Sequence, residues 1–248
     1  MFVDSHCHLD WFEEPEKIAK EAKEKGLGYI ISCSTNLESV KKNLQLAELL
    51  GSVKIALALH PSDLLRMNEA EKAEAMQLIN ENISKAVAVG ETGLDFKHAK
   101  TAEDKALQGT FFGKFIALAK EKNLPLIVHS RFAESKCIEL LEREKCGKVL
   151  MHWFKNSEQT LPRLLKLGFF ASIGPSVFTD AQAQKLAIEL PLDRMLLETD
   201  SPVRFSGKTA VPAWIPKIAE KVAELKGVSA KEVAEKTTEN AKRLFGLE

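Results

Sequence analysis

The stretch MFVDSHCHLDWF (residues 1–12) places a short apolar run directly before two histidines. A short apolar run bounded by polar residues predicts a buried strand, here Met1–Asp4. Side chains two residues apart in an extended chain point to the same face, so we expect His6 and His8 to project together and Cys7 to point away from them. A His-x-His pair alone indicates a metal site only weakly, so its meaning depends on what the rest of the chain adds.

Seven similar apolar runs follow the first one along the chain. The eight predicted strands are Met1–Asp4, Tyr29–Cys33, Lys54–Leu59, Ala86–Val89, Pro125–Val128, Val149–Met151, Phe169–Ile173 and Met195–Leu197. Helical patterns lie at Pro15–Lys25, Leu37–Leu50, Thr101–Asn123, Ala133–Lys145, Ser157–Leu167, Asp180–Leu190 and Ala213–Lys226, and the capping box Ser229-x-x-Glu232 opens a last helix.

This alternation predicts an α/β fold, a (β/α)8 TIM barrel, with residues 1–248 forming a single hydrolase domain. Parallel strands buried on both faces have continuous apolar runs of this kind. A doubly wound open sheet is the alternative, but it explains neither the count of eight nor the polar residues that follow the strands.

Residues that bind metals follow most of the predicted strands. They are His6 and His8 after the first strand, His60 after the third, Glu91 after the fourth, His129 after the fifth, His152 after the sixth, and Glu198 and Asp200 after the eighth. Only His98 lies deeper in a loop. The carboxyl ends of barrel strands converge on one mouth, where the active sites of this fold lie, so we expect these side chains to meet.

The ligand types favour a centre with two divalent ions. His6, His8, Glu91, His129, His152 and Asp200 are too many for one catalytic ion that keeps an open position. Two ions about 4 Å apart, bridged by a carboxylate, would use all six and activate water for hydrolysis. Imidazole suits zinc, and carboxylates also suit manganese or magnesium. A binding protein with a structural metal is disfavoured, because structural sites are closed by four ligands.

Composition and charge exclude several other classes of protein. The 35 Lys and Arg balance the 35 Asp and Glu, so no global field draws the chain to nucleic acid or to a membrane. No apolar run is long enough to span a bilayer, and the N-terminus lacks a signal-peptide pattern. The four cysteines show no CxxC spacing and are expected to be reduced thiols. We therefore expect a cytoplasmic protein with no membrane association and no obligate protein partner.

A series of motifs runs along nearly the whole chain. They are DSHCHLD (4–10), LHP (59–61), GETGLD (90–95), LPLIVHSR (124–131), MHWF (151–154), ETDSP (198–202) and TTENAKRLF (237–245). With this ordered set the sequence resembles the TatD-type metal-dependent deoxyribonucleases, which are amidohydrolase-like barrels. The resemblance implies that His6, His8 and Asp200 hold one ion, that Glu91 bridges, and that His129 and His152 complete the second site. It also implies hydrolysis of DNA phosphodiester bonds, often from a strand end.

Two segments depart from the family pattern, and both lie in loops that face the substrate. The family commonly has His-Cys-Phe-Ser-Gly after the sixth strand, where this chain has His152-Trp153-Phe154-Lys155-Asn156. After ETDSP the family usually has Arg-Asn-x-Pro, where this chain has Thr209-Ala210-Val211-Pro212. The substrate is therefore less determined than the metal chemistry. The alternative is a barrel hydrolase of a small ester, lactone or amide, which the same centre could also serve.

The loops at the predicted mouth combine cations with aromatic rings. The cations are Lys97, Arg131, Lys155, Arg204 and Lys208, together with His98, and the rings are Trp11, Phe12, Phe96, Phe132, Trp153, Phe154, Phe178 and Phe205. Single-stranded nucleic acid requires both, for phosphate and for base stacking. Because the guanidinium matches phosphate oxygens bidentately, Arg131 is the strongest candidate for a phosphate contact.

The predicted substrate-binding set is Arg131, His60, Trp153, Lys155 and Arg204, and the predicted catalytic residues are Asp200 and Glu91. Asp200 is expected to bind an ion and to accept a proton from the attacking water, with a low pKa next to two cations. Glu198 is expected to hydrogen-bond a ligand. With no net charge, the protein is expected to bind a short stretch or an end of DNA rather than a long duplex.

Overall fold

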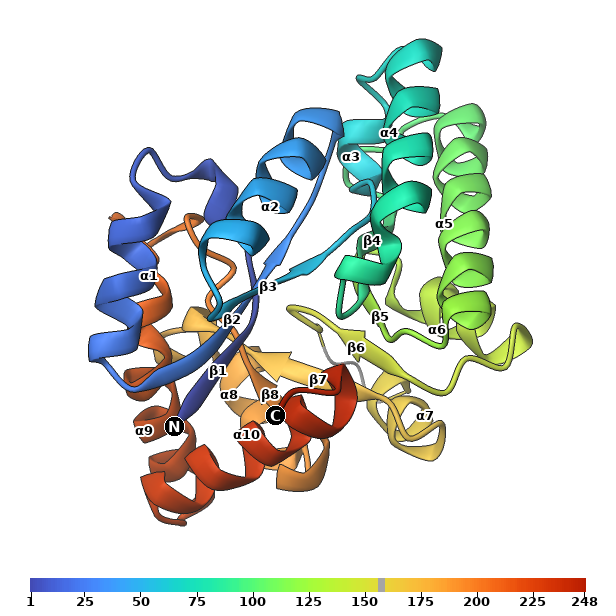
Figure 1. Cartoon of the computed structure of the whole chain (residues 1–248). Helices are drawn as coiled ribbons and strands as arrows, with labels where there is room; N and C mark the ends of the chain where they lie inside the picture. The colour runs from blue at the N-terminus through green and yellow to red at the C-terminus, as the bar shows by residue number, and fades with distance from the viewer. Residues whose placement is uncertain (156–158) are drawn as a thin grey trace.

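The computed structural model describes residues 1–155 and 159–248 and has eight parallel strands at its centre, surrounded by helices (Figure 1). The strands are β1 (Phe2–Cys7), β2 (Leu27–Cys33), β3 (Val53–Ala56), β4 (Val89–Asp95), β5 (Leu126–Arg131), β6 (Val149–Met151), β7 (Phe170–Ile173) and β8 (Met195–Leu197). They pair in chain order, β1 to β3 in one sheet and β4 to β8 in another.

Backbone hydrogen bonds close the two seams between these sheets. At the first seam the Leu57 N–H donates to the Ala88 carbonyl (3.2 Å), beside a parallel bridge between Ala56 and Ala88. At the second seam the Asp200 N–H donates to the His6 carbonyl (3.0 Å). The strands therefore follow one another around a closed (β/α)8 barrel, as the sequence predicts.

The helices lie on the outside of the barrel (Figure 1). They are α1 (Pro15–Glu24), α2 (Leu37–Leu49), α3 (Pro61–Leu64), α4 (Glu69–Asn82), α5 (Ala102–Lys122), α6 (Glu134–Arg143), α7 (Thr160–Lys166), α8 (Ala181–Glu189), α9 (Ile215–Lys226) and α10 (Ala230–Phe245). None of the described helices has the combination of length and apolar sequence that crossing a bilayer requires.

Some predicted boundaries differ from the observed ones. The predicted strand Ala86–Val89 ends where β4 begins, because the polar, glycine-rich GETGLD continues the strand by pairing with β5 as far as Asp95. Helix α4 was missed, although Asn68 and Glu71 form a capping box at its start. Its few buried residues do not produce a strong helical pattern of apolar residues in the sequence. The predicted helix start at Ser157 lies outside the described residues, as does Asn156.

The barrel is packed inside with one apolar residue from each strand or its edge. These residues are Val3, Ile31, Ala56, Ala88, Ile127, Leu150, Phe170 and Leu196, and they form one buried cluster with Ala241, Leu244 and Phe245 of α10. Thr238 of α10 donates a hydrogen bond to the Met1 carbonyl, so this helix covers the amino-terminal end of the strands (Figure 1). The carboxyl-terminal end is left to polar side chains.

Candidate metal centre

A layer of polar side chains follows the packed apolar interior at the carboxyl ends of the strands, on the same face of each strand. Two residues beyond Ile127 and Leu150 come His129 and His152, and successive steps of two from Leu196 reach Glu198 and Asp200. Since alternate side chains of a strand share a face, the same inward face that packs the core presents these groups at the mouth.

Strands β1 and β4 depart from this period at the site. Val3 and His6 are three residues apart, and the pairing of β1 with β2 shifts register between Asp4 and Cys7. The pairing of β4 with β5 shifts between Val89 and Thr92, which flank Glu91. Irregularities of this kind re-aim a side chain, and bulged strands often lie next to active sites.

Gly93 allows β4 to approach β5 closely beside the site. Its φ is +141°, and a Cβ there would lie 2.0 Å from the His129 carbonyl oxygen. Only glycine fits this position, which explains the second glycine of GETGLD.

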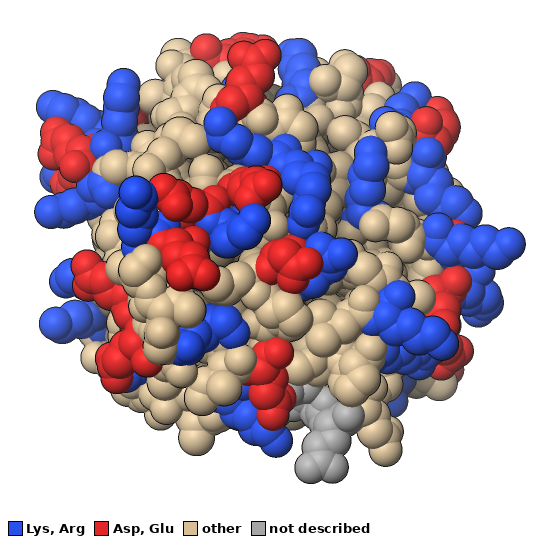
Figure 2. All heavy atoms as spheres, turned by 90° about the horizontal axis from the view of Figure 1, so that it is seen from below, with Lys and Arg blue, Asp and Glu red and all other residues tan. Residues whose placement is uncertain are grey.

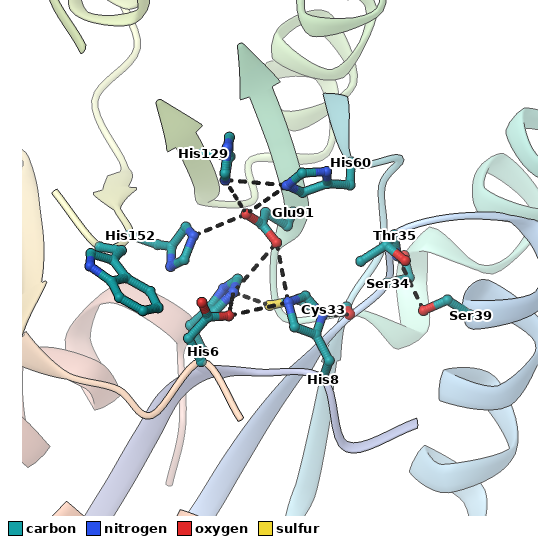
Figure 3. Close-up of polar contacts among 12 residues, drawn as sticks. His6, His8, Cys33, Ser34, Thr35, Ser39, His60, Glu91, His129 and His152 are labelled. Atoms are coloured by element: carbon teal, nitrogen blue, oxygen red, sulfur yellow. Dashed lines mark hydrogen bonds and ion pairs between the residues drawn. The ribbon is translucent and has the colours of Figure 1, made fainter. Parts of the chain in front are cut away.

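Glu91 lies at the centre of the site, with both carboxylate oxygens surrounded by imidazole nitrogens (Figure 3). Its Oε1 lies 2.8 Å from His129 Nδ1 and 3.0 Å from His152 Nε2. Its Oε2 lies 3.4 Å from Nε2 of both His6 and His8. Asp200 Oδ1 faces the same two nitrogens, at 3.3 Å and 3.4 Å. The six predicted ligands therefore converge.

The four histidines among these ligands are each held by a partner on the far side of the ring. His8 Nδ1 donates to the Cys33 carbonyl oxygen at 2.9 Å, and His6 Nδ1 lies 3.3 Å from the Cys33 thiol. On the other side, His129 Nε2 lies 3.1 Å from Asp95 Oδ2, and His152 Nδ1 lies 3.3 Å from Glu198 Oε2.

An outer partner of this kind fixes which nitrogen of a neutral histidine carries the proton and leaves the inner lone pair for a metal. Asp95 is a candidate site residue that the sequence analysis missed, although it belongs to the GETGLD motif. Its spacing could have revealed it, because Glu91, Gly93 and Asp95 lie two residues apart and alternate residues of a strand share a face. Glu198 contacts His152 as expected.

His60 differs from the other four histidines in its hydrogen bonding. The Ser62 N–H donates to His60 Nδ1 at 3.1 Å, which occupies the lone pair of that nitrogen. Burial also lowers the pKa of His60, so the ring is neutral and carries its proton on Nε2. This Nε2 lies 3.4 Å from Glu91 Oε1 and 3.2 Å from His129 Nδ1. His60 therefore presents a donor to the centre, although His60, Glu91 and His129 also cluster closely enough to hold an ion.

The surroundings of Glu91 and Asp200 favour the ionised form of both carboxyl groups. Burial would raise the pKa of Glu91, but the surrounding histidines hold it well below its ordinary value. The pKa of Asp200 is likewise lowered in spite of burial, because the rings of His6 and His8 lie beside its carboxylate. Burial opposes the charged form of His152, yet Glu91 and Glu198 raise its pKa well above the ordinary value.

The donor set fits divalent cations. Among residues 1–155 and 159–248, the clusters that could hold one are His6–His8–Asp200, His6–Glu91–His152 and His60–Glu91–His129. Within the described residues, the buried His6 Nε2 lacks a hydrogen-bond partner even though two carboxylates face it. The Nε2 lone pair of His6 points at ionised carboxylate oxygens, so there is no proton between them to form a hydrogen bond. A cation between the nitrogen and these oxygens would interact favourably with both.

A cavity of about 410 Å³ opens over the centre. Of the predicted substrate-binding residues, Arg131, His60, Trp153 and Lys155 line it. Arg204 is outside this lining, and its guanidinium donates to the Gly207 carbonyl (2.9 Å) in the hairpin of β9 (Arg204–Phe205) and β10 (Lys208–Thr209). His98, set apart by its loop position, lines the cavity and bonds Asp95 through Nδ1 (2.8 Å).

Comparison with known proteins relates the whole chain to a family. The family model described as TatD related DNase matches residues 3–246. An uncharacterized metal-dependent hydrolase of Bacillus subtilis, YabD, is 34% identical over the full length of both chains. The human deoxyribonuclease TATDN3 is 35% identical, with 98% of this chain and 94% of the human protein covered. The crystal structure of the TatD homolog YjjV from Escherichia coli superposes with a TM-score of 0.89 at 29% identity, covering 100% of this chain and 98% of that one.

Proposed function

The chain belongs to the TatD family of metal-dependent hydrolases, and we propose that it cleaves phosphodiester bonds of DNA at a centre of two divalent ions. One observation carries this proposal. Four histidines, each with a partner on the far side of its ring, point their inner nitrogens at the carboxylates of Glu91 and Asp200. These groups lie beneath a cavity that Arg131 and Lys155 line. Hydrolysis of an anionic ester needs metal ions that activate water and positive charges that bind the ester. These ligands and these cations could supply both.

The ligands divide into two sets around Glu91. His6, His8 and Asp200 would hold one ion, and His129 and His152 would complete the second site. Glu91 suits a bridging role because Oε2 faces the first set and Oε1 the second. Zinc, manganese and magnesium all suit a mixed set of imidazole and carboxylate ligands. Two bound divalent ions supply a water of lowered pKa and neutralise charge on the phosphate oxygens.

Asp200 is suited to act as the general base. Its Oδ1 faces the two histidines of β1, so Oδ2 is the oxygen available to take a proton from the attacking water. The side chain lines the cavity, and its lowered pKa keeps it ionised at neutral pH.

The cavity wall supplies groups that bind a phosphate. The exposed guanidinium of Arg131 can contact two phosphate oxygens at once, and Lys155 adds a second positive charge. The Nε2–H of His60 adds a neutral donor beside Glu91.

Surface charge favours a short substrate segment. On the face shown in Figure 2, lysine and arginine side chains alternate with aspartate and glutamate side chains, in keeping with a net charge of zero. Binding of a long duplex needs many phosphate contacts, whereas a cavity of about 410 Å³ suits the end of a strand. The cysteines are free, which fits a reducing compartment such as the cytoplasm.

A metal-supplemented substrate screen tests the proposal. Metal-free protein is loaded with Mn²⁺, Mg²⁺ or Zn²⁺ and assayed on end-labelled oligonucleotides and on a panel of simple esters, lactones and amides. We expect the wild type to shorten the oligonucleotides and Glu91→Gln to lose this activity. Elemental analysis should give two ions per chain. Turnover of the ester, lactone or amide panel without any DNA product would overturn the nuclease assignment. No more than one ion per chain at saturating metal would overturn the two-ion centre.

A further inference from the structure

Trp11 exposes a large aromatic surface at the metal centre. It ends the short 3-10 helix η1 (Leu9–Trp11) and is 51% exposed. The other exposed large apolar side chains of the described residues are Met1, Leu49, Phe132 and Ile188, and of the five only Trp11 lines the cavity. Trp11 therefore combines exposure with a place in the wall of the cavity, where a bound ligand could cover it.

The ring is tied to a candidate metal ligand. Trp11 stacks on His8 with ring centroids 4.5 Å apart and planes at 17°. His8 is itself fixed by the Cys33 carbonyl. One face of the indole is therefore covered by His8, and the opposite face remains for a second flat ring.

The backbone holds Trp11 in place. Its N–H donates to the His8 carbonyl at 3.1 Å, and the neighbouring Leu9 and Asp10 are buried. The Leu9 N–H donates to Ser32 Oγ at 3.1 Å, which anchors η1 to β2. A ring held in this way loses little freedom when a ligand stacks on it.

The charged groups that suit phosphate come from other strands. Arg131 ends β5 and Lys155 follows β6, whereas Trp11 follows β1. The cavity therefore combines a flat apolar surface with separate cations, and Glu91 and Asp200 of the centre also line it. A nucleotide has the same composition, a flat base joined through a sugar to a phosphate.

We propose that Trp11 forms a nucleobase subsite, in which the base of the nucleotide at the strand end stacks on the indole face opposite His8. This inference rests on the proposed function, since it assumes that the substrate is a nucleic acid. Because every base has a π-face, the subsite would bind bases without strong sequence preference. Stacking on a ring packed against His8 would set the distance between the base and the centre.

The test crosses one substitution with one change in the substrate. Wild type and Trp11→Ala are assayed on oligonucleotides that end either in a normal nucleotide or in an abasic residue. We expect Trp11→Ala to raise KM roughly tenfold on the normal end and to leave KM on the abasic end unchanged. Trp11→Phe should retain most of the affinity. Leu49→Ala, which removes an exposed apolar side chain outside the cavity lining, is the control and should change neither KM.

A second measurement does not depend on cleavage. Thymidine monophosphate should bind wild type more tightly than deoxyribose 5-phosphate does, and Trp11→Ala should abolish that difference while metal content is retained. Equal losses on normal and abasic ends would mean that Trp11 only supports His8, and would overturn the subsite. If wild type cleaves no oligonucleotide, the proposed function fails. In that case the inference still stands or falls on the thymidine monophosphate comparison.

Discussion

The two halves of the candidate metal centre use the same ligand type but support it differently. His6 and His8 of the first half are held by neutral groups of one residue, the thiol and the carbonyl of Cys33. His129 and His152 of the second half are held by the carboxyl groups of Asp95 and Glu198.

The difference shows two ways to place negative charge at a cation site. In the first half the charge of Asp200 lies directly beside the histidine nitrogens, at 3.3 Å from His6 Nε2. In the second half the negative charge acts through the rings of His129 and His152. A carboxylate hydrogen-bonded to the outer nitrogen of an imidazole raises the basicity of that imidazole as a metal ligand. We therefore expect the first half to depend on Asp200 itself and the second half to depend on residues that would not touch an ion.

The largest effect is expected at Asp200. Asp200→Asn keeps an oxygen that can bind an ion but cannot accept a proton, so kcat should fall by about 10²–10⁴-fold while much of the metal remains. The measurement is kcat together with metal content. A near wild-type rate with full metal content would contradict the base role, and joint loss of metal and activity would reduce Asp200 to a ligand.

The second half should respond to its outer carboxyl groups. Asp95→Asn and Glu198→Gln should each weaken binding of one ion by about 10–100-fold and leave the other ion unchanged, because these side chains orient His129 and His152. Isothermal titration of metal-free protein measures both sites. His98→Ala, which removes the other ring bonded to Asp95, is the control and should leave the His129 bond in place. If both ions weaken equally, the two halves do not act separately.

Metal binding should depend on pH, because protons occupy ligand nitrogens in the metal-free protein. Burial disfavours the charged form of His8, but the Asp200 hydrogen bond and Glu91 raise its pKa to about 9. The pKa of His129 is also raised in spite of burial, by Asp95 and Glu91. A pKa of about 9 means that His8 carries a proton at pH 7.5 and that a metal must displace it. Affinity should therefore increase as pH rises from 7 towards 9, by about tenfold per pH unit for each displaced proton.

Titrations at pH 7.5 in two buffers of different ionisation enthalpy count the released protons. The pKa of a ligand histidine is raised in both halves, so filling both sites should release more protons than filling the first site alone. Binding without proton release would contradict these protonation states.

Much of the fold could be predicted because its signals are local. Eight apolar runs separated by helical patterns were sufficient to predict the barrel, and the residues after them included His129, His152 and Asp200, which continue the strand period. Helix α4 was missed because its buried residues, Lys72, Ala75 and Ile79, include only one large apolar side chain.

The remaining errors occur where tertiary pairing overrides local sequence. GETGLD has the composition of a loop, yet β5 pairs with it and makes it part of β4, so Asp95 was not recognised as the partner of His129. The register shifts that turn His6 and Glu91 inward also depend on neighbouring strands. The tautomer of His60 depends on its hydrogen bond with Ser62, which only the folded chain shows.

The smallest effect is expected at Cys33, and it most directly tests the contrast between the halves. In Cys33→Ala the His8 contact with the backbone carbonyl remains, and only the thiol beside His6 Nδ1 is lost. A neutral hydrogen bond contributes about 0.5–1.5 kcal/mol, so affinity for the first ion should fall by about 2–10-fold, less than for Asp95→Asn. Cys33→Ser, which keeps an acceptor, should restore most of the affinity. Cys146→Ala, a thiol outside the cavity lining, is the control for loss of a cysteine. A loss at Cys33 as large as that at Asp95 would mean that the charge of the outer partner is unimportant, because an orienting contact of either kind would then be sufficient.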